Sequence, residues 1–147
     1  MKLFTPTLPA KTPDNLWRYA GLNHADGIML VDEIDKGLEG EVASRIVSWA
    51  QITQADLRRM TGIPSTTFSR SSKTRFSPDQ SERIVRFIRV FDKAVDLFEG
   101  DKIKALEWLN EPSRALGWKQ PSELLSSESG AYEVMRLITR LEHGVYS

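Results

Sequence analysis

The chain has 147 residues, of which 40% are hydrophobic and 27% are charged, and its 20 basic side chains balance 20 acidic ones. This composition excludes a disordered chain, and the length suits one domain or two small domains that share a core. The absence of cysteine excludes a disulfide scaffold, a thiol nucleophile and thiolate zinc sites.

Neither a membrane span nor a signal peptide is evident. No apolar run approaches the roughly 18 residues that a span requires. The N-terminal stretch MKLFTPTLPAKTP has prolines where a signal peptide would have its apolar core. We therefore expect a cytoplasmic protein with no membrane partner.

The balanced charge conceals three blocks of different sign. Residues 1–57 carry a net charge of −3, residues 58–90 carry +6, and residues 91–147 carry −3. Such asymmetry favours a polyanionic partner for the central block. The alternative is that its basic side chains only cover solvated helix faces, and charge alone leaves the two interpretations equally open.

The N-terminal part combines a proline-rich arm with two helical patterns. Prolines at positions 6, 9 and 13 predict an extended arm over residues 1–22, with Trp17 and Tyr19 fixing its end to the fold. Helical apolar spacing then recurs in residues 23–38 (Ile28, Val31, Ile34, Leu38) and in residues 42–49 (Val42, Ile46, Trp49).

The next stretch, TQADLRRMTGIPSTTFSR at residues 53–70, has the pattern of two short helices joined by a tight turn. Thr53 suits the N-cap of the first helix, with Asp56 three residues on. Gly62 suits the left-handed residue that ends it, and Pro64 can take the first position of the second. This is the arrangement of a helix-turn-helix, whose second helix docks in the major groove of DNA.

The exposed side of that second helix predicts contact with operator DNA. Short hydroxyl side chains can approach bases and phosphates closely, and arginine can grip a guanine by two hydrogen bonds. The predicted DNA-binding residues are Ser65, Thr66, Thr67, Ser69, Arg70, Lys73 and Arg75. Some helical hairpins only pack within a protein, but the polar face and the basic block together favour DNA.

Helical patterns continue to the end of the chain, and no strand pattern is present. The segment SPDQ at residues 77–80 predicts the start of a long helix that ends near residue 98. A short helix follows over residues 101–109, and Pro121 begins a further turn. Gly130 precedes a last helix, whose apolar face runs from Val134 to Leu141. The sequence therefore predicts an all-α fold.

The C-terminal third contains several unusual motifs in a fixed order. They are WLNEPSRALGWKQPSELL at residues 108–125, a small-residue break at SGAYEV, and the ending RLEHGVYS. This segment resembles the toxin-binding domain of the Xre/MbcA/ParS antitoxin family. The preceding FSPDQSERIVRFIRVFDKAVDLF matches a further feature of that family, so the resemblance covers residues 40–147.

The resemblance implies both an architecture and a function. A Cro/Xre-like helix-turn-helix domain would occupy residues 23–99, and a small helical toxin-binding domain residues 100–147. The protein would be an antitoxin that blocks the active site of a RES-domain toxin, an enzyme that degrades NAD, and that represses its own operon.

Within this domain, the residues predicted to bind the toxin are Trp108, Leu116, Trp118, Arg140, Leu141, His143, Gly144, Val145 and Tyr146. Burial of the two tryptophans in the core of the domain is an equally open alternative. Acidic, apolar segments before Thr53, together with the paired half-sites of operators, predict a homodimer.

The residue inventory opposes a small enzyme. His24 and His143 are the only histidines, so one chain cannot supply three nitrogen or sulfur ligands to a metal. His143 lacks an orienting carboxylate, and no glycine-rich phosphate loop is present. We therefore expect no catalytic residue, metal, cofactor or small-molecule substrate. The alternative function is a stand-alone transcription regulator whose C-terminal part dimerises or senses a ligand.

Overall fold

The computed structural model describes residues 14–144, and this range contains helices and no strand. The elements are α1 (Leu16–Tyr19), α2 (Gly27–Lys36), α3 (Val42–Ala50), α4 (Gln54–Thr61), α5 (Ser65–Ser72), α6 (Pro78–Leu97), α7 (Lys102–Leu109), the 3-10 helix η1 (Arg114–Leu116), α8 (Pro121–Leu124) and α9 (Glu128–Glu142). The all-α prediction is confirmed. Within this range, no helix has the length and apolar character needed to cross a membrane.

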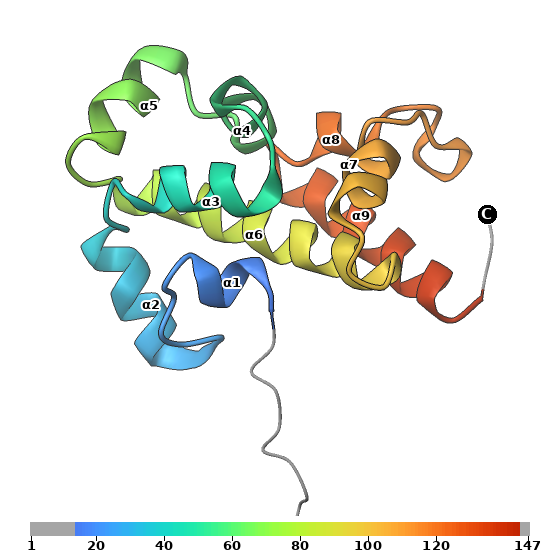
Figure 1. The fold of residues 1–147 in the computed structure, drawn as a ribbon, viewed down its shortest axis with the longest axis horizontal. Coiled ribbons are helices and arrows are strands. Elements are labelled where there is room, and N and C mark those ends of the chain that lie inside the picture. The colour runs from blue at the N-terminus through green and yellow to red at the C-terminus, as the bar shows by residue number, and fades with distance from the viewer. Residues whose placement is uncertain (1–13, 145–147) are drawn as a thin grey trace, which may run out of the picture.

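The long helix α6 forms the spine of the molecule (Figure 1). Ser77 accepts from the backbone N–H of Gln80, and the Gln80 side chain accepts from the N–H of Ser77 at 2.8 Å, which is the predicted capping box. α6 packs against α1, α2 and α4 as well as against α7 and α9. The N-terminal and C-terminal halves therefore share one hydrophobic core, and the predicted boundary at residue 100 follows the end of this shared helix.

Helices α4 and α5 form the predicted helix-turn-helix. Thr53 and Asp56 make reciprocal capping bonds of 3.0 and 3.2 Å at the start of α4. Gly62 ends α4 in the left-handed region, with a φ of 73°. Pro64 lies one residue outside α5 as its N-cap, because its ψ of 146° is extended and its carbonyl accepts from the N–H of Phe68.

The N-terminal segment departs from its prediction. The sequence predicts an extended arm up to residue 22, whereas α1 lies within it and Leu16 is fully buried. The N–H groups of Leu16 and Trp17 donate to the Asp92 carboxylate on α6, at 2.7 and 2.9 Å. Trp17 packs against the core as predicted, but Tyr19 is exposed. Asn15 caps α1 locally by accepting from the N–H of Arg18, but the carboxylate that holds its first two N–H groups comes from α6 and is not visible in the local pattern.

Helix α2 turns a different face inward from the one that the sequence predicts. Leu30 and Ile34 are buried one helical turn apart, and Leu38 is buried just beyond the helix end. Ile28 and Val31 belong to the predicted apolar stripe but lie on the solvent side, and Ile28 is 70% exposed. The predicted stripe is therefore wrong for these two residues, and α2 has an exposed apolar surface.

The last helix begins earlier than predicted. Ser127 caps it by accepting from the N–H of Gly130 at 3.0 Å, so Gly130 lies inside α9 and does not precede it. A Cβ atom on Gly130 would lie 2.1 Å from the carbonyl oxygen of Leu124. The glycine is needed because the end of α8 passes close to α9, and not because the helix must be interrupted.

Candidate functional site

Helix α5 presents a polar surface to solvent. The predicted DNA-binding residues that are exposed there, or just after the helix, are Ser65, Thr66, Ser69, Arg70, Lys73 and Arg75, whereas Thr67 is half-buried. No hydrogen bond or ion pair within residues 14–144 involves the side chains of Arg70 or Lys73. Both charges are therefore available to a ligand outside the chain.

A small number of contacts fixes the orientation of α5. Phe68 is fully buried, and its ring centroid lies 5.5 Å from that of Phe76. Ser71 donates to the Gln80 side chain at 2.9 Å. A Cβ atom on Gly40 would lie 2.3 Å from the Ser72 carbonyl oxygen, so the loop before α3 passes directly against the end of α5. These contacts leave the hydroxyl-rich face outward.

Most of the basic block contacts the protein itself. Arg59 donates to the Ser122 hydroxyl at 3.2 Å, and Arg86 donates to the carbonyls of Leu125 and Ser126 at 3.2 and 3.1 Å. Burial, followed by the neighbouring charge of Arg83, lowers the pKa of Arg86. These arginines join α4 and α6 to the segment around α8.

Other members of the block stabilise the N-terminal half. Arg75 is a predicted DNA-binding residue, but its guanidinium donates to the carbonyl of Gly37. Arg89 donates to the carbonyl of Ala25 at 3.2 Å and lies 5.3 Å from the ring centroid of Trp17. Arg75 and Arg89 remain exposed, but the part of the +6 block that is free of contacts within residues 14–144 is smaller than the sequence indicates.

The loop between α7 and α8 presents a large aromatic side chain. Ser113 and Lys119 pair as an antiparallel bridge, and the N–H of Trp118 donates to the Ser113 carbonyl at 2.8 Å. Gly117 and Trp118 both have a φ of 67°, which is costly for a bulky residue. The Trp118 side chain is nevertheless 67% exposed, so its unusual backbone is not explained by burial of the indole.

The other two apolar residues predicted in this region pack inward. Trp108 on α7 is half-buried, and its ring lies 6.4 Å from that of Phe98 at the end of α6. Leu116 is also half-buried against the core. The two tryptophans that the sequence could not distinguish thus differ, since Trp108 packs against Phe98 and the core whereas Trp118 faces solvent.

The end of α9 carries the remaining predicted toxin-binding residues. Arg140 and His143 are exposed, Leu141 is half-buried, and Gly144 follows with a φ of 74°. Lys93 on α6 lies 3.4 Å from the Glu142 carboxylate and holds this end of the helix. Val145 and Tyr146 lie outside the described residues.

Sequence reasoning missed one exposed face of α9. Tyr132, Met135, Arg136, Thr139 and Arg140 line a shallow pocket of about 370 Å³. Their helical spacing could have revealed this face, which lies opposite the buried side of the same helix.

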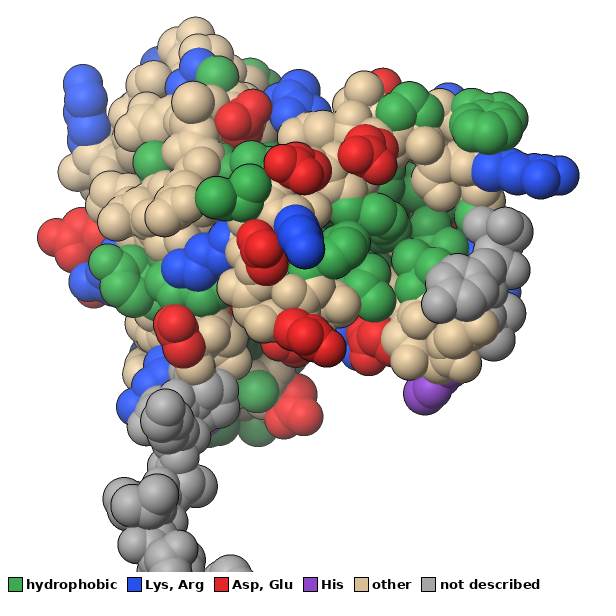
Figure 2. Space-filling view, turned by 45° about the vertical axis from the view of Figure 1, so that its right-hand side comes forward, with side chains coloured by type: hydrophobic (Ala, Val, Ile, Leu, Met, Phe, Trp, Pro, Cys, Tyr) green, Lys and Arg blue, Asp and Glu red, His purple; other side chains and the backbone are tan. Residues whose placement is uncertain are grey.

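The two surfaces lie at opposite ends of the molecule. Figure 1 shows α5 at one end and the end of α9 at the other, with α6 running between them. Figure 2 shows hydrophobic side chains gathered in a hollow of the C-terminal half, with acidic side chains around it. One end is therefore polar with free cations, and the other combines apolar and acidic groups.

These features define a class of protein before any comparison is made. The class is that of binding proteins with two separate surfaces, a helix-turn-helix at one end and an apolar helical surface at the other. Within residues 14–144, no three His, Asp or Glu side chains cluster so as to hold a metal ion.

Comparison with known proteins identifies the family. Residues 29–89 match the antitoxin Xre-like helix-turn-helix domain, and residues 93–144 match the antitoxin Xre/MbcA/ParS C-terminal toxin-binding domain. The chain is 48% identical to an antitoxin Xre of Yersinia enterocolitica over 149 aligned positions, which cover all of both chains. It is 42% identical to an antitoxin Xre of Photorhabdus laumondii subsp. laumondii, again over both full chains.

The chain belongs to the Xre antitoxin family. It is a non-enzymatic member of a toxin–antitoxin system, with a DNA-binding helix-turn-helix and a toxin-binding domain, and its partners are a cognate toxin and DNA. The family predicted from the C-terminal motifs is thereby confirmed, and a regulator without a toxin partner is not supported.

Proposed function

We propose that this antitoxin neutralises a RES-domain toxin by covering the entrance to an NAD-degrading active site. The observation that carries the proposal is the Trp118 indole, 67% exposed on a hydrogen-bonded loop of the toxin-binding domain. A costly backbone conformation at an exposed aromatic residue suits a side chain positioned for a partner. Aromatic anchors of this kind commonly dominate protein interfaces.

The charge of the C-terminal block supports the choice of toxin. An enzyme that consumes NAD binds an anionic pyrophosphate, so the mouth of its pocket presents cationic and polar groups. Residues 91–147 carry a net charge of −3, which complements such a rim. Leu141, His143 and Gly144 would enter the cleft together with Val145 and Tyr146. Arg140, exposed near the end of α9, would contact the toxin beside them, and Trp108 and Leu116 would shape the platform beneath from their half-buried positions.

At the other end, α5 would read the operator of the antitoxin's own operon. Ser65, Thr66, Thr67, Ser69 and Arg70 are the residues for the groove, and Lys73 would neutralise a phosphate. The antitoxin would act in the cytoplasm, where its operator DNA lies. Because so few cations remain available on one chain, operator affinity would depend on two copies binding together.

A homodimer would form through α2. Ile28, Met29 and Val31 are all exposed on this helix, and exposed Tyr19 lies on the neighbouring α1. An apolar surface of this kind suits a two-fold contact, in which the same residues of both copies meet. Two α5 helices related by this symmetry would then reach two half-sites of an operator.

The test is growth of cells that co-express the cognate toxin with a chain lacking residues 144–147, which leaves α9 and the Lys93–Glu142 pair intact. With the shortened chain we expect growth arrest and a fall in cellular NAD. With the full chain, growth and the NAD level should both be maintained. Circular dichroism and DNA binding of the shortened chain are the controls. Full protection by the shortened chain would contradict the cleft insertion, and arrest without loss of NAD would contradict the proposed toxin reaction.

A further inference from the structure

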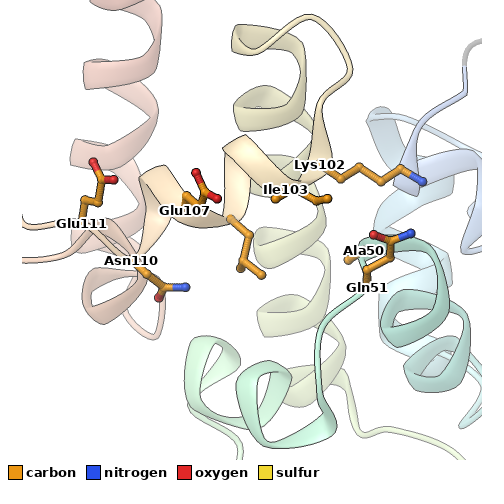
Figure 3. Close-up of a pocket in the computed structure, with 8 residues that line it drawn as sticks. Ala50, Gln51, Lys102, Ile103, Glu107, Asn110 and Glu111 are labelled. Atoms are coloured by element: carbon orange, nitrogen blue, oxygen red, sulfur yellow. The ribbon is translucent and has the colours of Figure 1, made fainter.

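A pocket of about 550 Å³ lies where the two halves of the antitoxin meet. Ala50 and Gln51 form one wall at the end of α3, and α7 forms the other with Lys102, Ile103, Leu106 and Glu107, followed by Asn110 and Glu111 (Figure 3). Ile103 is 63% exposed within this otherwise well-packed region. The pocket lies away from α5, and it is distinct from the Trp118 loop.

We propose that this pocket is the docking site for residues 1–13 of the same chain. The segment joins the fold beside the pocket. The Asp14 carboxylate accepts from the indole N–H of Trp49 at 3.0 Å, and Leu16 is tied to Asp92. The Lys102 ammonium group lies 3.8 Å from the centroid of the same Trp49 ring and also lines the pocket. The segment therefore starts at the pocket's rim.

The composition of residues 1–13 is complementary to the lining of the pocket. Residues 1–13 contain Leu3, Phe4 and Leu8, which match the apolar walls, and they contain two lysines and no acidic residue. The pocket is lined by the exposed carboxylates of Glu107 and Glu111 and by one ammonium group, that of Lys102, which lies over the Trp49 ring, so its charged lining is acidic on balance. A basic, apolar segment thus starts beside an apolar pocket with an acidic rim.

Residues 1–13 are long enough to reach the pocket, and their prolines reduce the conformational entropy that docking would cost. An extended chain spans about 3.3 Å per residue, so Phe4 can lie as far as about 30 Å from Asp14 and easily reaches the pocket. Prolines at positions 6, 9 and 13 restrict the segment before it binds, which lowers the entropy lost on docking. Extended proline-containing segments bind apolar grooves for the same reason.

Docking would have a structural consequence for the antitoxin. One wall of the pocket belongs to α3 of the DNA-binding half, and the other to α7 of the toxin-binding half. A segment held between them would join the two halves. The segment would serve as an intramolecular clasp.

The test uses the absence of cysteine from the natural chain. In the full-length antitoxin, Thr5→Cys is combined with Gln51→Cys in the pocket wall. The matched control combines Thr5→Cys with Ser48→Cys, which is exposed on the same helix but does not line the pocket. Equilibration of each pair with a glutathione buffer measures the effective concentration of the two thiols.

We expect a monomeric disulfide in the Gln51→Cys pair, with an effective concentration about tenfold or more above that of the Ser48→Cys pair. Adding Ile103→Asp in the pocket, or reversing the charge of the segment with Lys2→Glu and Lys11→Glu, should reduce that advantage. Equal effective concentrations for the two pairs would overturn the proposal. A disulfide that forms between chains would also overturn it, because the occupant would then come from a second copy.

Discussion

The two ends of this antitoxin present surfaces of different chemistry. At the α5 end, small hydroxyl groups and Arg70 lie on a helix whose only buried aromatic anchor is Phe68, and Lys73 follows directly after it. At the other end, one indole lies on a loop with a hydrogen bond between Trp118 and Ser113. In the function proposed here, the first surface would gain affinity from weak contacts repeated in two copies, whereas the second would depend on a single large anchor.

The charge distribution in the sequence suggests that the basic block serves mainly the DNA-binding end, but the structure shows otherwise. The +6 block lies beside the helix-turn-helix, yet Arg59 and Arg86 from that block connect it to the toxin-binding half. Charge that looks like a DNA footprint in the sequence therefore contributes to the contact between the two halves. Four kinds of substitution test this difference: those that disrupt the proposed dimer, those that remove the Trp118 indole, those that remove the cations beside α5, and one at Asp92.

The largest effect is expected from disrupting the proposed homodimer, which would bring two α5 helices to the operator. Ile28→Asp places a charge in the exposed apolar face of α2, so we expect the dimer to dissociate and operator affinity to fall about a hundredfold through lost avidity. Sedimentation and gel shifts measure the two effects. Ile103→Asp places the same charge on an exposed apolar residue of α7, outside the α2 face, and is the matched control that should change neither. A monomer that binds the operator as tightly as the natural protein would contradict this account.

Next in size is loss of the anchor. Trp118→Ala should weaken toxin binding by about 2 kcal/mol or more, roughly thirtyfold, because the exposed indole would no longer fill a pocket on the toxin. Titration calorimetry with the cognate toxin measures this loss. Trp118→Phe should retain part of the affinity, and DNA binding should be unchanged in both variants. An unaltered toxin affinity would mean that the loop lies outside the interface.

The third effect separates two cations of the α5 end. Arg70→Ala should weaken operator binding by about 1–3 kcal/mol and relax sequence choice, whereas Lys73→Ala should weaken all sequences alike and lower the salt slope by about 1. Gel shifts over a salt series distinguish the two.

Arg86→Ala is the control from the same basic block. Its guanidinium holds the carbonyls of Leu125 and Ser126, so the variant should lower the melting temperature and leave the salt slope unchanged. A lower slope in this variant would place Arg86 at the DNA instead.

Much of the fold follows from local sequence signals. The capping boxes at Thr53 and Ser77, and the turn at Gly62, depend on residues within three or four positions of one another. The family was also predictable, because its motifs are contiguous in the C-terminal third. These features need no knowledge of which distant segments meet.

The parts that could not be predicted depend on distant partners. Helix α1 is held by a carboxylate on α6, and the exposure of Ile28 depends on which face of α2 the core accepts. For the candidate site, Trp108 and Trp118 belong to the same motif, and only the fold shows that one packs and the other is exposed. Arg75 was unpredictable for the same reason, since its partner Gly37 is far away in the sequence.

The smallest effect concerns the support between the two ends, where Asp92 holds α1 against α6. Burial raises the pKa of Asp92, the N–H groups of Leu16 and Trp17 oppose that rise, and Asp96 and Asp14 add to it. The folded protein thus keeps this proton to a higher pH than the unfolded chain, in which an aspartate titrates near about 3.9. Its stabilising contribution is complete below that pH and is lost as pH rises through the folded pKa.

Asp92→Asn removes this titration while keeping one oxygen that can accept from the backbone of α1. We therefore expect the difference in free energy of unfolding, natural protein minus variant, to fall as pH rises from about 4 to about 7. Urea unfolding at a series of pH values measures that difference, and hydrogen exchange at Leu16 and Trp17 reports whether α1 itself is loosened. If the difference rises with pH instead, the two amide hydrogen bonds outweigh burial, and the ionised carboxylate is what holds α1 in place.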